Sequence, residues 1–139
     1  MISRVLVPMD DSEIAERALE FALETHSDAE IVVLHVVGVP SPLMGEAVRL
    51  ALEDDVEEAA EESAEEVFER ARELAVERGR EITTVVGVGQ PAKAILDHAE
   101  NVDLVVIGSH KRHGASRILT GNVSETVVRQ SSVPVTVVG

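Results

Sequence analysis

The sequence contains no cysteine, no tryptophan and no tyrosine, and it has only two phenylalanines. Without cysteine the chain can form neither a disulfide nor a thiolate-bound metal site. With so few aromatic rings it lacks the stacking surfaces on which single-stranded nucleic acids bind. The charge balance also disfavours nucleic-acid binding. The chain has 26 acidic and 12 basic residues, and the resulting net charge of -14 repels polyanions. We therefore expect no nucleic-acid partner.

Long apolar segments are also missing. No run approaches the roughly 18 apolar residues that cross a bilayer, and the amino terminus lacks the apolar core of a secretory signal. We therefore expect a cytoplasmic protein with no membrane partner. Only two of the 12 cations are lysines, and the excess acid is spread over the predicted surface helices. This composition suits a cytoplasm rich in salt, which suggests a halophilic source.

At 139 residues the chain can bury a core as one domain, residues 1–139. Strand-like and helix-like patterns alternate along it. The predicted strands are Arg4 to Val7, Ile31 to Val37, Glu81 to Val86, Asp103 to Ile107 and Pro134 to Val138. The predicted helices are Ile14 to His26, Glu46 to Arg78, a segment that begins at Pro91, and Asn122 to Gln130. This order predicts an α/β fold with one parallel sheet between helices.

Ligands of such sheets bind beyond the carboxyl ends of the strands, where the strand order switches. Three predicted loops leave strands at that edge, at Pro8 to Asp11, at Gly38 and at Gly108 to Gly121. We therefore expect these loops to converge on one crevice.

Residues 104–124 contain no acidic side chain, although the chain as a whole is strongly acidic. The basic side chains in this stretch are His110, Lys111, Arg112, His113 and Arg117. They lie between a strand and the amino end of a helix, where backbone N–H groups and the helix dipole favour anions. We interpret the stretch as a phosphate-binding loop; a chance grouping of cations on a solvated loop is the alternative. The two histidines form only a weak metal-binding pattern, and we expect them to face solvent or phosphate.

Asp10 is the first polar residue after the first strand, and it has two interpretations. It could cap the following helix, with Glu13 as the partner in a capping box, although Asp11 and Ser12 are further cap candidates. It could also accept a hydrogen bond from a sugar hydroxyl or a base amino group, or bind a hydrated Mg²⁺. The sequence leaves both roles open.

Asn122 opens its predicted helix, so it is first a cap candidate with Glu125 as its partner. A capping asparagine leaves nearby N–H groups free to hold phosphate. His35 lies within a strand, and we expect a buried imidazole with internal hydrogen bonds. The sequence shows no nucleophile beside a histidine and an acid, so we expect no fast catalysis.

The chain resembles the universal stress protein family over essentially its whole length. The residues that carry the resemblance are Val5 to Asp10, Leu34 to Val37, Gly108-Ser109-His110, Gly121 and Val128 to Val138. The resemblance implies an adenine nucleotide alpha hydrolase-like fold, a doubly wound parallel sheet of five strands in the order 3-2-1-4-5. It also implies a homodimer joined through Pro134 to Val138.

The ATP-binding branch of this family has a glycine, two residues, a glycine, nine residues, a glycine and then Ser or Thr. Gly108 matches the first glycine and Gly121 the third, but Lys111 stands at the second and Asn122 at the Ser or Thr. Lysine does not allow the close backbone approach of glycine, yet its amine can hold phosphate as a point charge. Asn122 can donate from its amide.

The resemblance further implies the residues of a nucleotide site. Pro8, Met9 and Asp10 would line the ribose and base pocket, with Val36 against adenine and Asp10 near any Mg²⁺ that accompanies ATP. The phosphates would be surrounded by Gly108, Ser109, His110, Lys111, Gly121, Asn122, Val123 and Ser124.

The implied function is a dimeric regulator of the stress response that binds ATP or a related adenine nucleotide, with at most slow hydrolysis. The alternative is a family member that binds no nucleotide and acts as an interaction scaffold. A nucleotide-dependent enzyme is disfavoured, because the first strand is followed neither by a Ser-Gly-Gly-x-Asp-Ser loop nor by a His-x-x-His pair.

Overall fold

The structure, a computed structural model, describes residues 1–38, 46–109 and 122–139, and only the backbone of residues 46–60 and 122. Five parallel strands form one sheet in the order β3-β2-β1-β4-β5. The strands are β1 (Arg4–Pro8), β2 (Glu30–Val37), β3 (Thr83–Val88), β4 (Leu104–Gly108) and β5 (Val135–Val138). The predicted α/β class and strand order are therefore confirmed.

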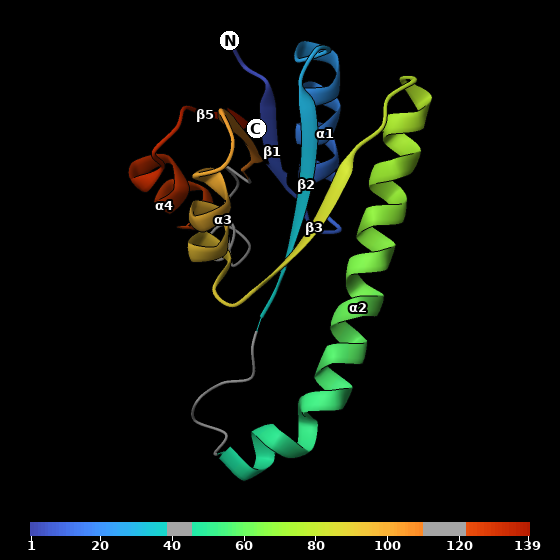
Figure 1. Cartoon of the computed structure of the whole chain (residues 1–139), viewed down its shortest axis with the longest axis vertical. Helices are drawn as coiled ribbons and strands as arrows, with labels where there is room; N and C mark the ends of the chain where they lie inside the picture. Colours follow the sequence, from blue (N-terminus) through green and yellow to red (C-terminus); the bar gives the residue numbers. More distant parts are fainter. Residues whose placement is uncertain (39–45, 110–121) are drawn as a thin grey trace.

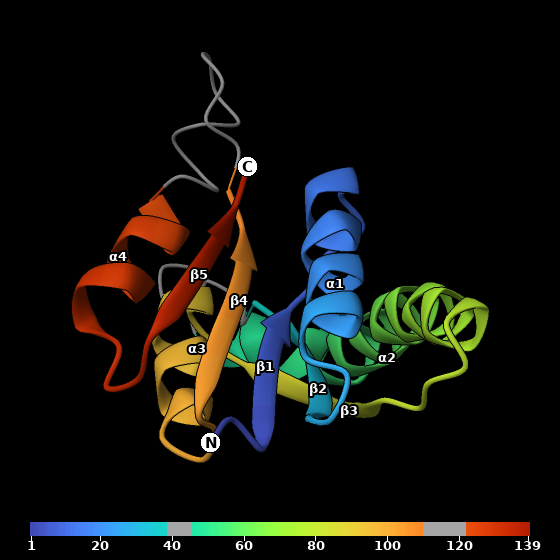
Figure 2. The same ribbon diagram turned by 90° about the horizontal axis from the view of Figure 1, so that it is seen from above.

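Helices cover both faces of this sheet (Figures 1 and 2). The helices are α1 (Glu13–Thr25), α2 (Glu46–Glu77), α3 (Pro91–Ala99) and α4 (Asn122–Gln130). Two separate clusters of buried side chains result, one beneath α1 and α2 and one beneath α3 and α4. In β1, Val5 and Val7 belong to the first cluster and Leu6 to the second, because successive strand residues point to opposite faces. Burial on both faces explains why the central strands are apolar throughout.

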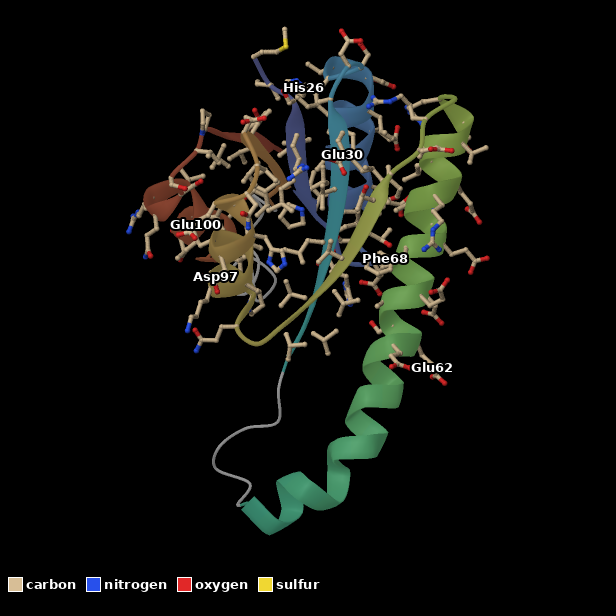
Figure 3. The ribbon with its side chains drawn as sticks, in the orientation of Figure 1. His26, Glu30, Glu62, Phe68, Asp97 and Glu100 are labelled. Carbon is tan, nitrogen blue, oxygen red and sulfur yellow. The ribbon has the colours of Figure 1, made fainter. Side chains whose placement is uncertain are left out.

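The long helix α2 packs only its carboxyl-terminal half on the sheet, while its amino-terminal half extends beyond the sheet (Figure 1). Val67, Ala71 and Leu74 are buried as the sequence predicts. Phe68 points toward the sheet and Glu62 away from it (Figure 3).

The helix α2 ends at Glu77, one residue before the predicted Arg78, and Gly79 follows as the residue that terminates it. This glycine has a φ of 65°, and its N–H and that of Arg80 donate to the carbonyls of Val76 and Ala75. These two bonds form a Schellman motif, in which glycine adopts the left-handed conformation without strain.

The third strand lies two residues further along the chain than the predicted Glu81 to Val86. Gly87 was expected to end the strand, but it pairs with Val36 inside the ladder. A Cβ atom at Gly87 would make a tight contact of 3.2 Å with Leu34 Cδ1 and an ordinary van der Waals contact of 3.5 Å with Ala94 Cβ on α3. The turn occurs instead at Gly89, whose φ is 119°.

The first strand is held at its start by Asp103, at the opposite end of the sheet from the strands' carboxyl ends. The Asp103 carboxylate accepts hydrogen bonds from the N–H groups of Ser3 and Arg4 at 2.9 and 3.0 Å. These two bonds stabilise the ionised carboxylate and lower its pKa. They fix where β1 begins relative to β4.

Arg80 stabilises the connection between α1 and β2 through hydrogen bonds to its backbone. Its guanidinium donates to the carbonyls of Leu23, His26 and Ala29 at 2.7, 3.2 and 2.6 Å. These carbonyls lie at and just beyond the end of α1, where the helix leaves carbonyls without helical partners. One side chain thus satisfies three acceptors.

We expect Arg80→Ala to lower the free energy of unfolding by about 2 kcal/mol, because partly buried carbonyls lose their donors. Arg72→Ala is the matched control. The Arg72 side chain is 49% exposed and pairs only with Glu65 among the described residues, and exposed pairs contribute about 0.5 kcal/mol. Urea denaturation of both variants measures the difference, and equal losses would contradict the role of Arg80.

Candidate functional site

A pocket of about 270 Å³ opens at the carboxyl ends of β1, β2 and β4. The chain runs outward from β1 to β2 and β3 and then returns to β4 on the other side of β1. The pocket therefore lies where the strand order switches, the position at which α/β sheets bind ligands. Its lining residues are Pro8, Met9, Asp10, Ser12, Ile14, Ala15, Leu34, His35, Val36, Pro91, Ile95, Ile107, Gly108 and Val123.

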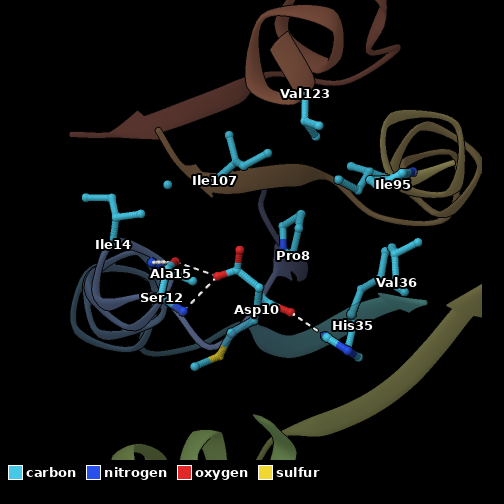
Figure 4. Close-up of a pocket in the computed structure, with 14 residues that line it drawn as sticks. Pro8, Asp10, Ser12, Ile14, Ala15, His35, Val36, Ile95, Ile107 and Val123 are labelled. Atoms are coloured by element: carbon cyan, nitrogen blue, oxygen red, sulfur yellow. Dashed lines mark hydrogen bonds between the residues drawn. The ribbon is translucent and has the colours of Figure 1, made fainter. Parts of the chain in front are cut away.

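One side of the pocket is apolar. Val36 from β2, Ile95 from α3 and Val123 from α4 lie on this side, and Ile107 from β4 extends it toward Ile14 (Figure 4). An apolar wall with a few polar groups at one end is the usual construction of a small-molecule site. This side can accept a flat apolar or aromatic group.

The opposite side carries Asp10 and Ser12. Ser12 is the N-cap of α1, because its hydroxyl oxygen accepts from the Ala15 N–H at 3.2 Å. The N–H and hydroxyl of Ser12 both donate to Oδ1 of Asp10. The second carboxylate oxygen of Asp10 points into the pocket (Figure 4). Asp10 therefore supports the start of the helix with one oxygen and offers the other to a ligand, and the cap itself is Ser12.

Gly108 lies where β4 passes closest to α1. A Cβ atom at this position would lie 2.7 Å from the backbone oxygen of Ile14, closer than the 3.0 Å below which real Cβ atoms essentially never approach another atom. The packing of the strand against the helix therefore requires glycine here, independently of any ligand. Gly108 also lines the pocket.

The amino end of α4 is turned toward the same pocket. Val123, in the first turn of α4, is a lining residue. The N–H groups of a first helical turn carry partial positive charge. An anion at the mouth of the pocket would therefore be stabilised from this side.

Ser109 and Ser124 are adjacent to the pocket residues Gly108 and Val123, but neither is a lining residue. Their side chains are buried, and the Ser124 hydroxyl donates to the Ser109 hydroxyl at 3.0 Å. The Ser109 N–H donates to the Val138 carbonyl at 2.8 Å. The pair thus joins the end of β4 to the start of α4.

Part of the predicted site lies outside the described residues. This part includes His110, Lys111 and Gly121, together with the remaining cations of the predicted phosphate loop. Asn122 is described as the first residue of α4, without its side chain. Of the predicted residues, the structure brings Pro8, Met9, Asp10, Val36, Gly108 and Val123 together around one pocket.

Sequence reasoning missed the contribution of α3, whose Pro91 and Ile95 line the pocket. The connection from β3 to β4 must pass over β2 and β1, and α3 contacts all three strands β1, β2 and β3. The strand order implied by the family resemblance already contained this information. Sequence reasoning also missed His35 as a lining residue of the pocket, although the burial of His35 was predicted correctly.

Among the described residues, no group of three or more His, Cys, Asp and Glu side chains is arranged to hold a metal ion. No described helix has both the length and the apolar character needed to cross a membrane. Among the lining residues that the structure describes, Asp10 is the only acidic one.

The chain matches one family model, that of the universal stress protein family, over residues 1–139. Two universal stress proteins of Methanocaldococcus jannaschii are similar along nearly the whole chain. One is 30% identical, in an alignment that covers 99% of this chain and 95% of the relative. The other is 32% identical, in an alignment that covers 99% of this chain and 82% of the relative.

Solved structures of the same fold come from distant organisms. Universal stress protein UspA from Lactobacillus plantarum superposes with a TM-score of 0.77 at 23% identity, over 99% of this chain and 98% of that chain. A universal stress protein in complex with cAMP has a TM-score of 0.72 at 24% identity, over 99% and 97%. A family protein from Arabidopsis thaliana with AMP bound has a TM-score of 0.68 at 21% identity, over 98% and 90%.

Proposed function

The chain belongs to the universal stress protein family, and we propose that it is a stress-response regulator that binds ATP or a related adenine nucleotide in the pocket. The observation that carries this proposal is the pocket itself. An apolar wall, a free carboxylate oxygen and the amino end of a helix face one space at the switch point of the sheet. These are the surfaces that a base, a ribose and a phosphate need.

The base would occupy the apolar side, against Val36 and Ile95. The ribose would lie over Pro8 and Met9, where the free oxygen of Asp10 can accept a bond from a hydroxyl group. The phosphates would extend past Gly108 to the start of α4, toward the predicted cations that include Lys111. Mg²⁺ bound to ATP would be held chiefly by phosphate oxygens and water, with Asp10 as the nearest described carboxylate.

Related structures support the choice of an adenine nucleotide, because proteins of this fold bind AMP and cAMP. The choice of ATP rests on the predicted phosphate loop. The Ser12 hydroxyl lies beside the Asp10 carboxylate in the pocket, but it is engaged as the N-cap of α1, so we propose binding without fast catalysis.

Calorimetric titration with ATP and Mg²⁺, and separately with AMP, tests the proposal. We expect saturable binding with one nucleotide per chain, weakened by added salt because phosphate contacts are ionic. No heat at millimolar concentrations of both ligands would favour the alternative, an interaction scaffold that binds no nucleotide.

We also propose that the protein is a homodimer joined through β5. This strand lies at the edge of the sheet. Val105 of β4 and Ser109, the residue after β4, donate to the carbonyls of Pro134 and Val138, respectively. By the two-residue alternation of a strand, the N–H and C=O of Val137 therefore point away from β4, toward the free edge. A second copy of β5 could pair with this edge about a two-fold axis.

Val137→Pro tests the dimer, because it removes an outward N–H group without removing a bond to β4. Val135 is unsuitable, since it packs against the core beneath α3 and α4. We expect Val137→Pro to be monomeric by light scattering, with Val137→Thr, which keeps the N–H group, remaining dimeric. A dimeric proline variant would place the interface elsewhere, for instance at the other sheet edge, β3.

The cytoplasmic location, the salt-rich source, and the absence of nucleic-acid and membrane partners stay predictions from the composition. Measuring the unfolding midpoint over a range of KCl concentrations would show whether the protein depends on salt.

A further inference from the structure

We propose that His35 is a positioning residue for the pocket, which acts through the backbone of Met9 on the direction of the Asp10 carboxylate. This inference deepens the proposed nucleotide site and rests on it. The imidazole of His35 is 9% exposed, and its Nδ1 lies 2.9 Å from the Met9 carbonyl oxygen (Figure 4).

The hydrogen bond between His35 Nδ1 and the Met9 carbonyl occurs where the β1–β2 ladder ends. Pro8 is paired with Leu34, so the next pair along the ladder would be Met9 and His35. The Met9 N–H still donates to the Leu34 carbonyl, at 2.8 Å. In a ladder that continued, the Met9 carbonyl would accept from the backbone N–H of Val36. It accepts from the His35 side chain instead, so the Met9 carbonyl keeps a donor where the chain leaves the sheet.

The ring itself is fixed from three directions. The Met9 carbonyl can only accept, so Nδ1 carries a proton, and Nε2 lies within hydrogen-bond distance of the Ser63 hydroxyl on α2. That contact, between Nε2 and Ser63 Oγ, measures 3.3 Å. The ring of Phe68 packs against the imidazole edge to face, with centroids 6.4 Å apart. A ring held in this way cannot turn without breaking at least one of these contacts.

The consequence falls on Asp10, the residue after Met9. Its carboxylate is held on one side by the Ser12 N–H, which donates to Oδ1 at 2.9 Å. On the other side, the peptide that joins Met9 to Asp10 is held by His35. Without His35 this peptide is free to rotate, and the second carboxylate oxygen would no longer be directed at the pocket. His35 therefore need not touch the ligand to affect its binding.

Four substitutions separate this role from general stability. His35→Leu removes the donor, whereas His35→Asn keeps an N–H group at about the same distance from the backbone. His98→Leu is the matched control, because Nδ1 of His98 bonds a backbone carbonyl, that of Ala94, at 2.9 Å within α3. Ser63→Ala releases the ring without leaving a cavity in the core, so it keeps the test open if His35→Leu folds poorly.

The first readout needs no ligand. Amide hydrogen exchange of Ser12 by NMR reports its bond to Asp10. We expect exchange about tenfold faster in His35→Leu, about threefold faster in Ser63→Ala, and little change in His35→Asn or His98→Leu. Unchanged protection of Ser12 in His35→Leu and Ser63→Ala would overturn the inference.

The second readout is the dissociation constant of AMP. We expect the affinity for AMP to fall about tenfold in His35→Leu, which corresponds to about 1.4 kcal/mol of binding free energy. In a protein that already carries Asp10→Ala, adding His35→Leu should lower the affinity for AMP less than about twofold, because His35 acts through Asp10. Equal losses in both backgrounds would overturn the inference. If the wild type binds no AMP, the proposed function fails, and the exchange of Ser12 still decides the role of His35.

Discussion

Gly108→Ala is expected to lower the free energy of unfolding by about 3 kcal/mol, at the upper end of overpacking costs because the clash is with backbone. The new Cβ would meet the Ile14 carbonyl oxygen at 2.7 Å and the Ile14 carbonyl carbon at 3.0 Å. Backbone atoms within α1 cannot move aside as a flexible side chain could. The end of β4 and the start of α1 would have to separate, and both line the pocket.

Gly38→Ala is the matched control for this variant. A Cβ atom at Gly38 meets no atom within 4 Å, and its φ is not in the left-handed region. We expect its free energy of unfolding to stay within about 1 kcal/mol of the wild type. Chemical denaturation of the two variants gives the comparison. If Gly108→Ala were as stable as Gly38→Ala, the glycine would serve the ligand and not the packing.

Val36→Asp should weaken the binding of adenine nucleotides by more than about a hundredfold, or about 2.7 kcal/mol. Val36 is half-buried and forms part of the apolar wall. A carboxylate there would have to lose its hydration beneath the base, and it would also repel the phosphates. We expect the fold to persist, because this position is near the end of β2 and is only half-buried.

Val88→Asp provides the comparison for that variant. Val88 ends the neighbouring strand, pairs with Val37 and is 67% exposed, but it does not line the pocket. Its nucleotide affinity should stay within about threefold of the wild type, a change of roughly 0.6 kcal/mol. Equal losses in the two variants would mean that added negative charge, and not the apolar wall, controls binding.

Much of the fold could be predicted from the sequence. The apolar strands Ile31 to Val37 and Asp103 to Ile107 were placed within one residue, because burial on both faces leaves an unmistakable apolar run. The family resemblance is confirmed, and with it the strand order. The third strand was misplaced because Gly87 was interpreted as a turn, whereas it pairs with Val36 inside the ladder.

The candidate site was less predictable than the fold. The sequence placed Asp10 beside the crevice. It could not show that one carboxylate oxygen bonds Ser12 while the other points into the pocket. The family resemblance implies a phosphate contact of Ser124 from the start of α4, but it could not show that the Ser124 hydroxyl bonds the buried hydroxyl of Ser109. Such partners depend on which segments meet in space, and strand β4 and helix α4 are separated in the sequence by the predicted phosphate loop. Motif positions alone do not specify side-chain direction.

The central claim is that an adenine nucleotide binds in this pocket, and an NMR titration of ¹⁵N-labelled protein with ATP and Mg²⁺ tests it most directly. We predict saturable shifts of the backbone amides of Met9, Asp10, Val36, Gly108 and Val123, which line the pocket. Saturation is expected below about 1 mM, which corresponds to a binding free energy stronger than about -4 kcal/mol. Shifts confined to other surfaces, or none at several times that concentration, would contradict the account.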